Sequence, residues 1–473
     1  MKKKLLALTL GLMSFQSASA VDLLTTYQQA LAYDSELAAA RAAYEAEMAG
    51  RRQALSPMLP QLNAFGEGSH TDRDTDYNAD DSFKSTSYGV RLTQPLFRAD
   101  VYYDYQASEK NELRAKAEYW LAQQSLMLNV SESYFNVLRT EDALTTARAT
   151  EAALKRQWEQ AKERYDVGLI AITEVLEARA AYDDSKSRRI TAANQVAVAK
   201  ESLARLTGQY HDNLDKLKRD FPIAGPEPSN LKRWEDTALM ENLSIRAARF
   251  RVEASESQVN SAEAGHYPTL DLTASHTRTN VEGQSSALTP DEYENQSSAL
   301  TPDEYENQDS VIALNLTVPL YSGGGTQAGV RRANALQEQA QQQLLTAQRN
   351  VRVNTRSLYR TIVNNIETVQ AQKQTIVSRR SALEATRAGY RVGTRNIVEV
   401  LDAEQAYYVA LRDYANARYD YVINSLQLKQ AAGTLKAEDI IQLDHWLSES
   451  APGIEAMAAE VQEQVDPITP KKQ

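Results

Sequence analysis

The chain has no cysteine and few Phe and Trp residues, with 7 Phe and 4 Trp among its 473 residues. Without cysteine, neither disulfide bonds nor thiolate chemistry can operate. Hydrophobic residues make up 42% of the chain, which is ample for burial. Because so few of them are Phe or Trp, the composition favours thin packing spread along helical seams over one large globular core.

Excess positive charge and long apolar runs are also missing. The formal net charge is −11, which argues against nucleic acid as a partner, because nucleic-acid binding favours a basic face. After the first 20 residues no apolar run approaches the roughly 20 residues that a membrane-spanning helix needs. Spans made of short alternating strands remain open to the chain.

The first 20 residues have the three parts of a secretory signal peptide. Lysines 2–4 form a basic cluster, an apolar run follows, and Ala18-Ser19-Ala20 supplies a small-residue cleavage site. The sequence therefore predicts cleavage before Val21. A transmembrane anchor is the weaker alternative, because the apolar run is too short to span a bilayer.

Glycine and proline are absent from four long stretches, which are residues 101–167, 169–207, 330–388 and 394–432. Gly168 separates the first two stretches, and Gly389 and Gly393 separate the last two. Only glycine adopts φ > 0 without penalty, so these positions predict tight turns between long helices. The flanking sequences are alike: YDVGLIAITEVLEARAAY (165–182) and YRVGTRNIVEVLDAEQAY (390–407). We therefore predict two long helical hairpins, with tips at residues 165–174 and 389–402.

The rest of the chain also divides into two similar halves, joined by a proline-rich linker at residues 221–232. The first repeat, residues 21–220, is predicted to contain a helix at Leu23–Leu55, a β-hairpin at 59–97 and a helical hairpin at 99–207. The β-hairpin consists of strands Leu59–Thr71 and Lys84–Phe97 around a polar loop, His70–Ser87. The second repeat, residues 233–447, is predicted to contain a helix at Trp234–Ala264, a β-hairpin at 267–321 with strands Tyr267–Thr279 and Asp309–Tyr321, a helical hairpin at 326–433 and a short helical piece that reaches Leu447.

Two segments are predicted to be irregular. Residues 285–296, SSALTPDEYENQ, recur identically at 297–308, and a perfect polar copy of this kind is tolerated only in a surface loop. The C-terminal residues 448–473 are acidic and marked by proline, which predicts a disordered tail.

Four strands in one chain have a consequence for assembly. Four strands cannot close a barrel, and an open edge cannot face lipid, so a membrane barrel would have to be shared between chains. Two copies would give eight strands and a plugged lumen, whereas three would give twelve and leave a pore. The helices also favour a wall of helices built from several chains. Residues 407–428 carry two adjacent apolar stripes, so a helix there can pack between two neighbours, whereas an ordinary coiled coil needs one stripe.

Catalysis finds little support in the sequence. The five histidines show no metal-ligand spacing, and there is no P-loop, GxSxG motif or GxGxxG turn, so no cofactor site is predicted. A structural coiled-coil surface fibre or adhesin is an alternative from another class. It would explain long helices and an exposed loop, but not two alternating β-hairpins in each chain.

The paired YxVGxxxIxEVLxA tips, the PQL and PTLDL strand openings, and the LTQPLF and LTVPLYSGG junctions resemble the outer-membrane efflux protein family. The resemblance runs from about Leu23 to Leu447. It implies a homotrimer with a twelve-stranded β-barrel in the outer-membrane lipid and a twelve-helix tunnel in the periplasm. It also implies an exit duct that works with a periplasmic adaptor and an inner-membrane pump or ABC exporter, and that exports drugs, bile salts or proteins.

The resemblance assigns roles to three sets of residues near the tips. Adaptor docking falls to the turn residues Gly168, Leu169, Gly393 and Thr394. The links that close the periplasmic end fall to Thr173, Glu174, Tyr390 and Arg395. Glu399 and Asp402 lie at i and i+3 on one helix face, so three copies would form an acidic ring around a narrow axis that attracts cations.

The chain departs from the family pattern at three places. The tandem copy at 285–308 belongs to no family pattern, so the shape of the external loop does not follow from the resemblance. Glu399 stands where relatives often have aspartate, which keeps the charge and changes the reach. Arg387 stands where a relative can carry an acid, which puts a tip contact with Gln157 in question.

Overall fold

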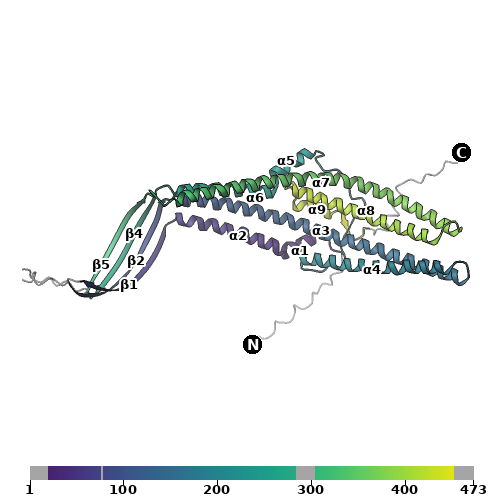
Figure 1. Ribbon diagram of the computed structural model, residues 1–473, viewed down its shortest axis with the longest axis horizontal. Coiled ribbons are helices and arrows are strands. Elements are labelled where there is room, and N and C mark those ends of the chain that lie inside the picture. The colour runs from purple at the N-terminus through teal and green to yellow at the C-terminus, as the bar shows by residue number, and fades with distance from the viewer. Residues whose placement is uncertain (1–19, 76–77, 284–303, 452–473) are drawn as a thin grey trace, which may run out of the picture. The chain divides into compact units, whose positions relative to one another are not determined.

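The computed structural model describes residues 20–75, 78–283 and 304–451. The order of its elements repeats, because two helices, two strands and two long helices follow one another twice (Figure 1). The first repeat consists of α1 (Leu23–Tyr33), α2 (Ser35–Leu55), β1 (Gln61–Thr75), β2 (Asn78–Phe97), α3 (Ala99–Asp166) and α4 (Ile172–Thr207). The second consists of α5 (Leu231–Glu241), α6 (Leu243–Ala264), β4 (Thr269–Glu282), β5 (Glu304–Thr317), α7 (Gly325–Arg391) and α8 (Ile397–Ala431). The predicted fold class, mostly helical with two tandem repeats, is confirmed.

The first helix of each repeat is broken, where the sequence predicted one continuous helix. The break falls at Asp34 between α1 and α2, and at Asn242 between α5 and α6. Both residues leave the helical conformation, with ψ of 122° and 127°. Asp34 Oδ1 accepts a hydrogen bond from the Leu37 amide at 2.7 Å, and Asn242 Oδ1 accepts from Ser244 and Ile245. Each side chain therefore caps a new helix, and neither break lies at a glycine or proline that would have revealed it.

The chain divides into two compact units, and the smaller one consists of Ala42–Ala117 and Ala247–Thr346. It contains a four-stranded antiparallel sheet in the order β1-β2-β4-β5 (Figure 1). The middle pairing, β2 with β4, joins the two repeats. Within the described residues, β1 and β5 have no strand on their outer sides, so the sheet has two open edges.

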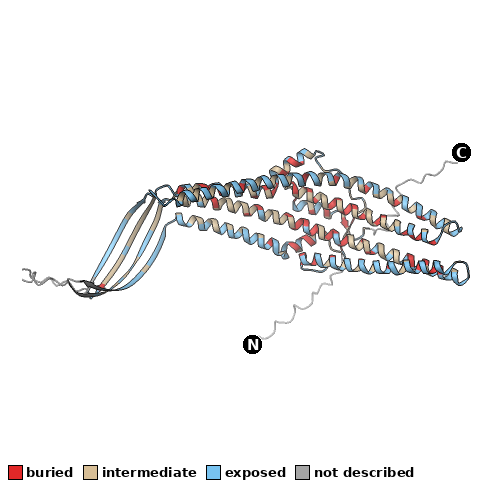
Figure 2. Ribbon diagram, in the orientation of Figure 1, coloured by how far each residue is buried: buried red, intermediate tan, exposed pale blue. Residues whose placement is uncertain are grey.

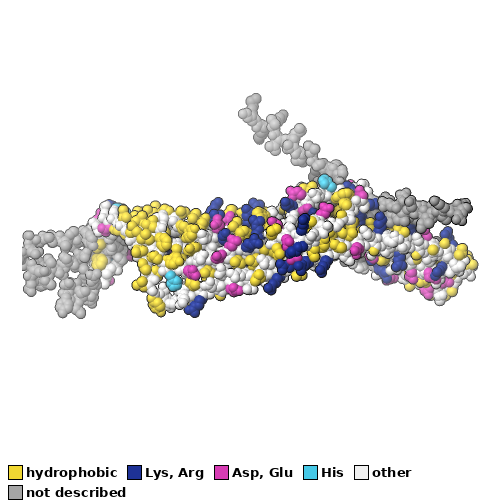
Figure 3. Space-filling view, turned by 90° about the horizontal axis from the view of Figure 1, so that it is seen from above, with side chains coloured by type: hydrophobic (Ala, Val, Ile, Leu, Met, Phe, Trp, Pro, Cys, Tyr) yellow, Lys and Arg dark blue, Asp and Glu magenta, His cyan; other side chains and the backbone are white. Residues whose placement is uncertain are grey.

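The register of the sheet puts apolar residues on one face. Leu62 pairs with Leu92, Leu92 with Ala274, and Ala274 with Ile312, so one apolar row crosses all four strands. On β5 this face continues through Leu314 and Leu316, and these two side chains and Ile312 are 63–80% exposed. Figure 3 shows hydrophobic side chains gathered over the strands. A single chain therefore leaves uncovered an apolar surface that a membrane would cover.

The strands extend further than predicted at the outer ends of both hairpins. The first ladder continues through the predicted loop His70–Ser87 as far as the pair Thr75 and Asn78, because polar side chains do not prevent backbone pairing. In the second hairpin β5 begins at Glu304, so the last five residues of the tandem copy lie in a strand. The remainder of the copy, up to residue 303, lies outside the described residues. At its other end β5 stops at Thr317, two residues before Pro319, which cannot donate to a ladder.

The larger unit consists of Met1–Arg41, Glu118–Arg246 and Ala347–Gln473, and it contains both helical hairpins. Its core is a belt where α1, the middle of α3 and α8, and the short helix α9 (Ala437–Asp444) pack together (Figure 2). Tyr134, Phe135 and Ile440 are completely buried there. Tyr134 also donates from its hydroxyl to the carbonyls of Val21 and Asp215. The core is thus narrow and follows the helices, as the small number of Phe and Trp residues predicted.

Two short strands that the sequence did not predict fasten this belt. Strand β3 (Lys216–Leu217) pairs antiparallel with β6 (Leu447–Ser448), so the end of the first repeat joins the end of the second. Beside them, Val21 forms an isolated bridge with Leu214. Ser448 therefore belongs to a strand, although the predicted disordered tail began there. The tail beyond residue 451, like the predicted signal peptide, lies outside the described residues.

Candidate functional site

The two tips close with the same hydrogen-bond pattern. In the first, Gly168 has φ of 76°, its amide donates to Tyr165, and the Leu169 amide donates to Arg164. In the second, Gly393 has φ of 80°, its amide donates to Tyr390, and the Thr394 amide donates to Gly389. This pair of bonds is the Schellman motif, which satisfies the last carbonyls of a helix and requires a left-handed residue. The predicted turns are confirmed.

The helices that follow the tips start differently. Asn396 caps α8, because its side chain accepts a hydrogen bond from the Glu399 amide at 2.9 Å. Ala171 precedes α4 and offers no side-chain cap. A cap of this kind contributes about 1 kcal/mol. The start of α8, next to Arg395 and Glu399, is therefore held more firmly than the start of α4.

Both tips present apolar side chains and open space. Val167, Leu169 and Val392 are each about 70% exposed, far more than apolar residues of the belt. A Cβ built on Gly168 or Gly393 would meet no atom within 4 Å. The tips therefore have room for another backbone to approach closely, as the predicted docking residues Gly168, Leu169, Gly393 and Thr394 require.

Between the tips and the belt, the two helical hairpins pack against each other through a small apolar cluster, which we call the seam. The seam consists of buried Leu154 from α3 and Ile397 and Leu401 from α8, with Ala181, Tyr182 and Tyr390 beside them. Tyr182 also stacks on Trp158, with ring centroids 5.7 Å apart. The seam thus buries far fewer apolar residues than the belt.

Tyr390 lies against Arg164, which the sequence reasoning did not identify. Arg164 Nη1 donates to the Tyr390 hydroxyl at 2.5 Å, and its Cζ lies 5.1 Å from the ring centroid. Arg164 occupies the position equivalent to Gly389 in the second repeat, and a Cβ at Gly389 would lie 2.7 Å from Arg395 Cγ. The asymmetry of these two positions was the signal in the sequence that could have revealed this contact.

The other predicted gate residues do not meet within one chain. Arg395 forms an ion pair with Glu399 one turn further along the same segment, with an N–O distance of 2.6 Å. Thr173 is exposed and Glu174 half-buried at the start of α4. The links predicted between Tyr390 and Thr173 or Glu174, and between Arg395 and an acid, therefore stay predictions.

Gln157 and Arg387 are connected by a third residue, Glu404. The Glu404 carboxylate accepts from Gln157 Nε2 at 3.1 Å with one oxygen, and from Arg387 Nη2 at 2.8 Å with the other. Glu404 is only 4% exposed, although it carries a charge. The tip contact that the sequence put in question is therefore made indirectly, and Glu404 was missed.

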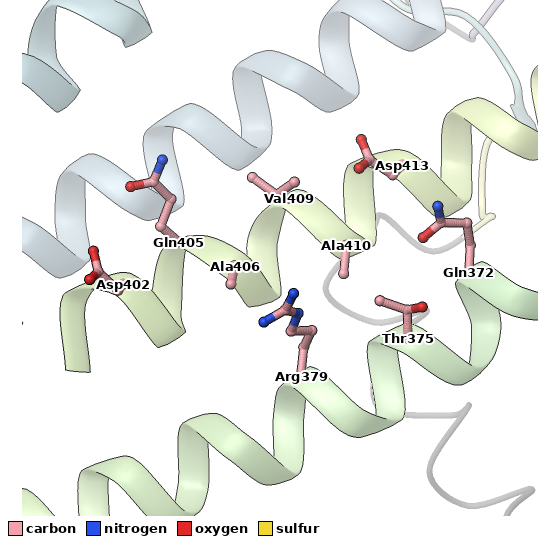
Figure 4. A pocket seen from close by; sticks show the side chains of 9 residues that line it. All are labelled: Gln372, Thr375, Arg379, Asp402, Gln405, Ala406, Val409, Ala410 and Asp413. Atoms are coloured by element: carbon pink, nitrogen blue, oxygen red, sulfur yellow. The ribbon is translucent and has the colours of Figure 1, made fainter. Parts of the chain in front are cut away.

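Asp402 of the predicted acidic ring lies at one end of a groove of about 480 Å³ between α7 and α8. Arg379 points from α7 toward α8, and Asp402 and Asp413 lie near opposite ends of the groove (Figure 4). Asp402 is exposed, whereas Glu399 is half-buried and paired with Arg395. The two acids of the predicted ring are therefore not equivalent.

A buried acid pairs with a tyrosine between α3 and α8. Tyr419 donates from its hydroxyl to Asp142 Oδ2 at 2.7 Å, and both side chains are buried. Burial raises the pKa of Asp142 to about 6, although the bond from Tyr419 and the charges of Lys216 and Arg418 act in the opposite direction. The folded chain therefore holds a proton on Asp142 at a pH where the unfolded chain does not.

This raised pKa predicts a pH-dependent cost. Since the folded state binds the proton more tightly, stability falls as the pH rises from the ordinary aspartate pKa of about 4 through 6. The full cost above pH 6 is up to about 3 kcal/mol. We expect Asp142→Asn, which keeps an acceptor for Tyr419, to raise the melting temperature at about pH 8 and to have little effect at about pH 4. Asp183→Asn on the exposed face of α4 is the control, and equal shifts in the two variants would contradict the prediction.

The part of the chain that the structure describes holds neither a metal-binding cluster nor a helix that could cross a membrane. Within residues 20–75, 78–283 and 304–451, no group of three or more histidine, aspartate or glutamate side chains is placed to hold a metal ion. Over the same ranges, every helix is too short or too polar to cross a membrane.

Known proteins share both the sequence and the fold. The family model "Outer membrane efflux protein" matches residues 26–209 and 234–434, that is, one match in each repeat. The outer membrane protein TolC of Escherichia coli is 35% identical over 450 residues, which cover 94% of this chain and 90% of TolC. The alkaline protease secretion protein AprF of Pseudomonas aeruginosa is 27% identical over 434 residues, which cover 90% of this chain and 87% of AprF.

Among solved structures, the outer membrane protein VceC of Vibrio cholerae superposes with a TM-score of 0.71 at 19% identity, over 87% of this chain and 96% of VceC. At that identity the likeness shows the fold alone. The family match covers most of the chain and falls on both repeats, and the TolC match covers nearly the whole of both chains. The chain therefore belongs to the outer membrane efflux protein family.

Proposed function

We propose that this outer-membrane efflux protein is the exit duct of efflux pumps and type I secretion systems, built from three copies of the chain. The observation that carries the proposal is the four-stranded sheet with an apolar face and two open edges. In lipid, unpaired edge groups each cost several kcal/mol, so the edges must pair with other copies. Three copies supply twelve strands, enough for a barrel with an open lumen.

The long helical hairpins supply the second half of the proposal. At 1.5 Å per residue, α3 and α7 each span roughly 100 Å, far beyond the thickness of a bilayer. With α4 and α8, the two hairpins supply four helices per chain, so three copies would give a tunnel of twelve helices that extends into the periplasm. The name of AprF connects that relative with protease secretion, which supports export of proteins as well as small molecules. We assign the chain a transport role and no catalytic one.

The tips are the proposed docking site for a periplasmic adaptor, which in turn contacts an inner-membrane pump or ABC exporter. Support comes from the exposed Val167, Leu169 and Val392 and from the open space beside both glycines. Between copies, Tyr390 and Arg395 of one chain and Thr173 and Glu174 of another would form the links that keep the periplasmic end shut. Each exposed link contributes about 0.5–1 kcal/mol, and threefold repetition makes the closed state dominant but reversible.

Two measurements test the proposed assembly, the mass of the complex in detergent and its ion conductance in a lipid bilayer. We expect native mass spectrometry in detergent to show a stable trimer, because closing the barrel removes every open edge. We also expect the purified protein to conduct ions across a planar lipid bilayer. A stable monomer or dimer would contradict the shared barrel, and a trimer that never conducts would contradict the duct while leaving the assembly intact.

A further inference from the structure

A row of exposed arginines runs along α7 in the larger unit. The positions i, i+3, i+7 and i+11 lie on one side of a helix. The arginine stripe, as we call the row at these positions, consists of Arg349, Arg352, Arg356 and Arg360, all of which are exposed. Between Glu338 and Glu367 the helix has no acidic residue, although the whole chain has a net charge of −11. Figure 3 shows Lys and Arg side chains gathered over the helices on the face that carries α5.

Another side of α7 packs into the belt at the same level. Ile362 is buried there, and Val351, Leu358 and Ile366 pack against the same cluster. These four residues also repeat at helical spacing, on a side of the helix different from that of the arginines. The apolar side therefore anchors α7 to the belt and leaves the arginine stripe at the surface of the chain.

A buried acid on α5 fixes the two middle arginines. The Glu235 carboxylate pairs through one oxygen with Arg352 Nε and through the other with Arg356 Nη2, both at 2.8 Å. The Glu235 side chain is only 3% exposed, whereas the two arginine side chains are 45% and 48% exposed. A guanidinium group has five N–H donors, so both arginines keep donors for a further partner. Glu235 thus orders the two groups without using up their hydrogen-bonding capacity.

The ends of the stripe carry charge that no acid opposes. In the part of the chain that the structure describes, Arg349 and Arg360 have no ion-pair partner. Lys232 on α5 lies 3.8 Å from Glu235 and pairs with Asp236 at 2.8 Å. The stripe and Lys232 therefore hold five positive charges against two acids, an excess of three per chain. Ordered guanidinium groups suit carboxylates, because two N–H groups of the planar fork match the two carboxylate oxygens.

The position of the stripe along α7 indicates which carboxylates it would meet. Helix α7 begins at Gly325, soon after the last strand of the sheet. At 1.5 Å per residue, Arg349 and Arg360 lie roughly 36 and 52 Å further along the helix. Attraction to a charged lipid surface falls off within about 8 Å in physiological salt, so a membrane at the sheet is too distant. The periplasm also contains the cell wall, a polymer whose short peptides end in free carboxylates.

We propose that the arginine stripe is a docking surface for the peptide carboxylates of the cell wall. The proposal rests on the proposed periplasmic tunnel, because a duct that extends from the outer membrane into the periplasm has to pass through this polymer. Three copies would present three stripes around the tunnel, so the wall would hold the duct from several sides. The stripe lies far from the tips, where the adaptor is proposed to dock, so both partners could bind together.

Sedimentation with isolated cell-wall sacculi tests the docking surface. The full-length protein in detergent is mixed with purified sacculi in about 0.15 M salt, and the fraction that sediments is measured at increasing sacculus concentration. We expect Arg349→Gln with Arg360→Gln to weaken binding by about tenfold or more, because it removes two charge-assisted contacts. This double variant leaves both ion pairs of Glu235 in place, so the fold of the belt is preserved.

A matched control and two modified probes identify the chemistry. Arg331→Gln with Arg332→Gln removes the same charge from exposed positions nearer the start of α7 and should bind sacculi like the wild type. Coupling ethanolamine to the sacculi with a carbodiimide turns their carboxylates into amides and should reduce wild-type binding to the level of the stripe variant. Equal binding by the wild type and the stripe variant, or full binding to amidated sacculi, would overturn the proposal. So would binding to phosphatidylglycerol vesicles but not to sacculi, which would assign the stripe to a lipid surface.

Native mass spectrometry and conductance separate the docking surface from the duct. The stripe variant should form the same oligomer as the wild type and conduct equally in a planar bilayer. A stripe variant that dissociates into monomers would show that the stripe joins copies of the chain, which would contradict the docking role. A wild-type protein that binds sacculi through the stripe but does not conduct would contradict the duct and leave the docking surface standing.

Discussion

Gly393→Arg is expected to abolish efflux while the trimer still assembles. Gly393 has φ of 80°, and a Cβ added there would meet no atom within 4 Å, so the side chain can start without a clash. The left-handed conformation costs a non-glycine residue about 1–2 kcal/mol, which a long helical hairpin tolerates. The side chain would instead project from the second tip and block the close approach of an adaptor backbone. The measurement is the resistance of cells to a bile salt or dye, which should fall to that of cells without the protein.

The smaller substitution at the same position separates bulk from strain. Gly393→Ala imposes the same backbone conformation with a single methyl group, so we expect nearly normal resistance. Gly323→Arg offers a second control, because Gly323 has φ of 63° and equally open space but lies at the junction between β5 and α7. Loss of efflux in Gly393→Ala would mean that strain, and not docking, explains the first variant.

Asp402→Ala is expected to remove most of the block that trivalent cations exert from the periplasmic side. In a trimer Glu399 and Asp402 would supply six carboxylates, but each Glu399 is paired with Arg395. The unopposed charge of the ring then comes mainly from the exposed Asp402, and closely spaced like charges attract multivalent cations strongly. Block should weaken by about tenfold or more in Asp402→Ala, as measured by the current that remains at increasing cation concentration.

The ordering of the variants is the sharper part of this prediction. Glu399→Ala should have a smaller effect than Asp402→Ala, because it also releases Arg395. The double variant should abolish block without closing the pore. Asp184→Ala on α4 removes an exposed acid from the other hairpin and should change nothing. Equal block in the wild type and the double variant would place the cation site elsewhere.

The turns and hairpins could be predicted because glycine acts locally. Gly168, and Gly393 together with Gly389, interrupt runs that are free of glycine and proline over dozens of residues, and the left-handed conformation of Gly168 and Gly393 follows from the residue type. The strands could also be predicted, because apolar and polar residues alternate along them. At the polar outer ends of the β-hairpins, the alternation of residues did not indicate where the strands end, because strand pairing depends on backbone hydrogen bonds.

The missed features depend on residues that are distant in the chain. Asn242 breaks a helix partly because its side-chain Nδ2 donates to the Ala431 carbonyl, 189 residues further on. Glu404 looks like any acid on a helix surface until the fold buries it beside Gln157, 247 residues away. Tyr390 meets Arg164 for the same reason. No local pattern indicates which charged residue will be enclosed by a neighbouring hairpin.

The pairing of β3 with β6 sets an order of events during maturation. Leu217 of the first repeat finds its partner, Leu447, only 230 residues later. A chain that is translocated with its N-terminus first delivers that partner only after the whole second hairpin, and contacts of such long sequence separation form slowly. Until then the first repeat would wait in the periplasm with an unpaired strand edge and apolar seams exposed to other chains. A shortened chain that ends before Leu447 would lose this closure altogether, however complete its two hairpins were.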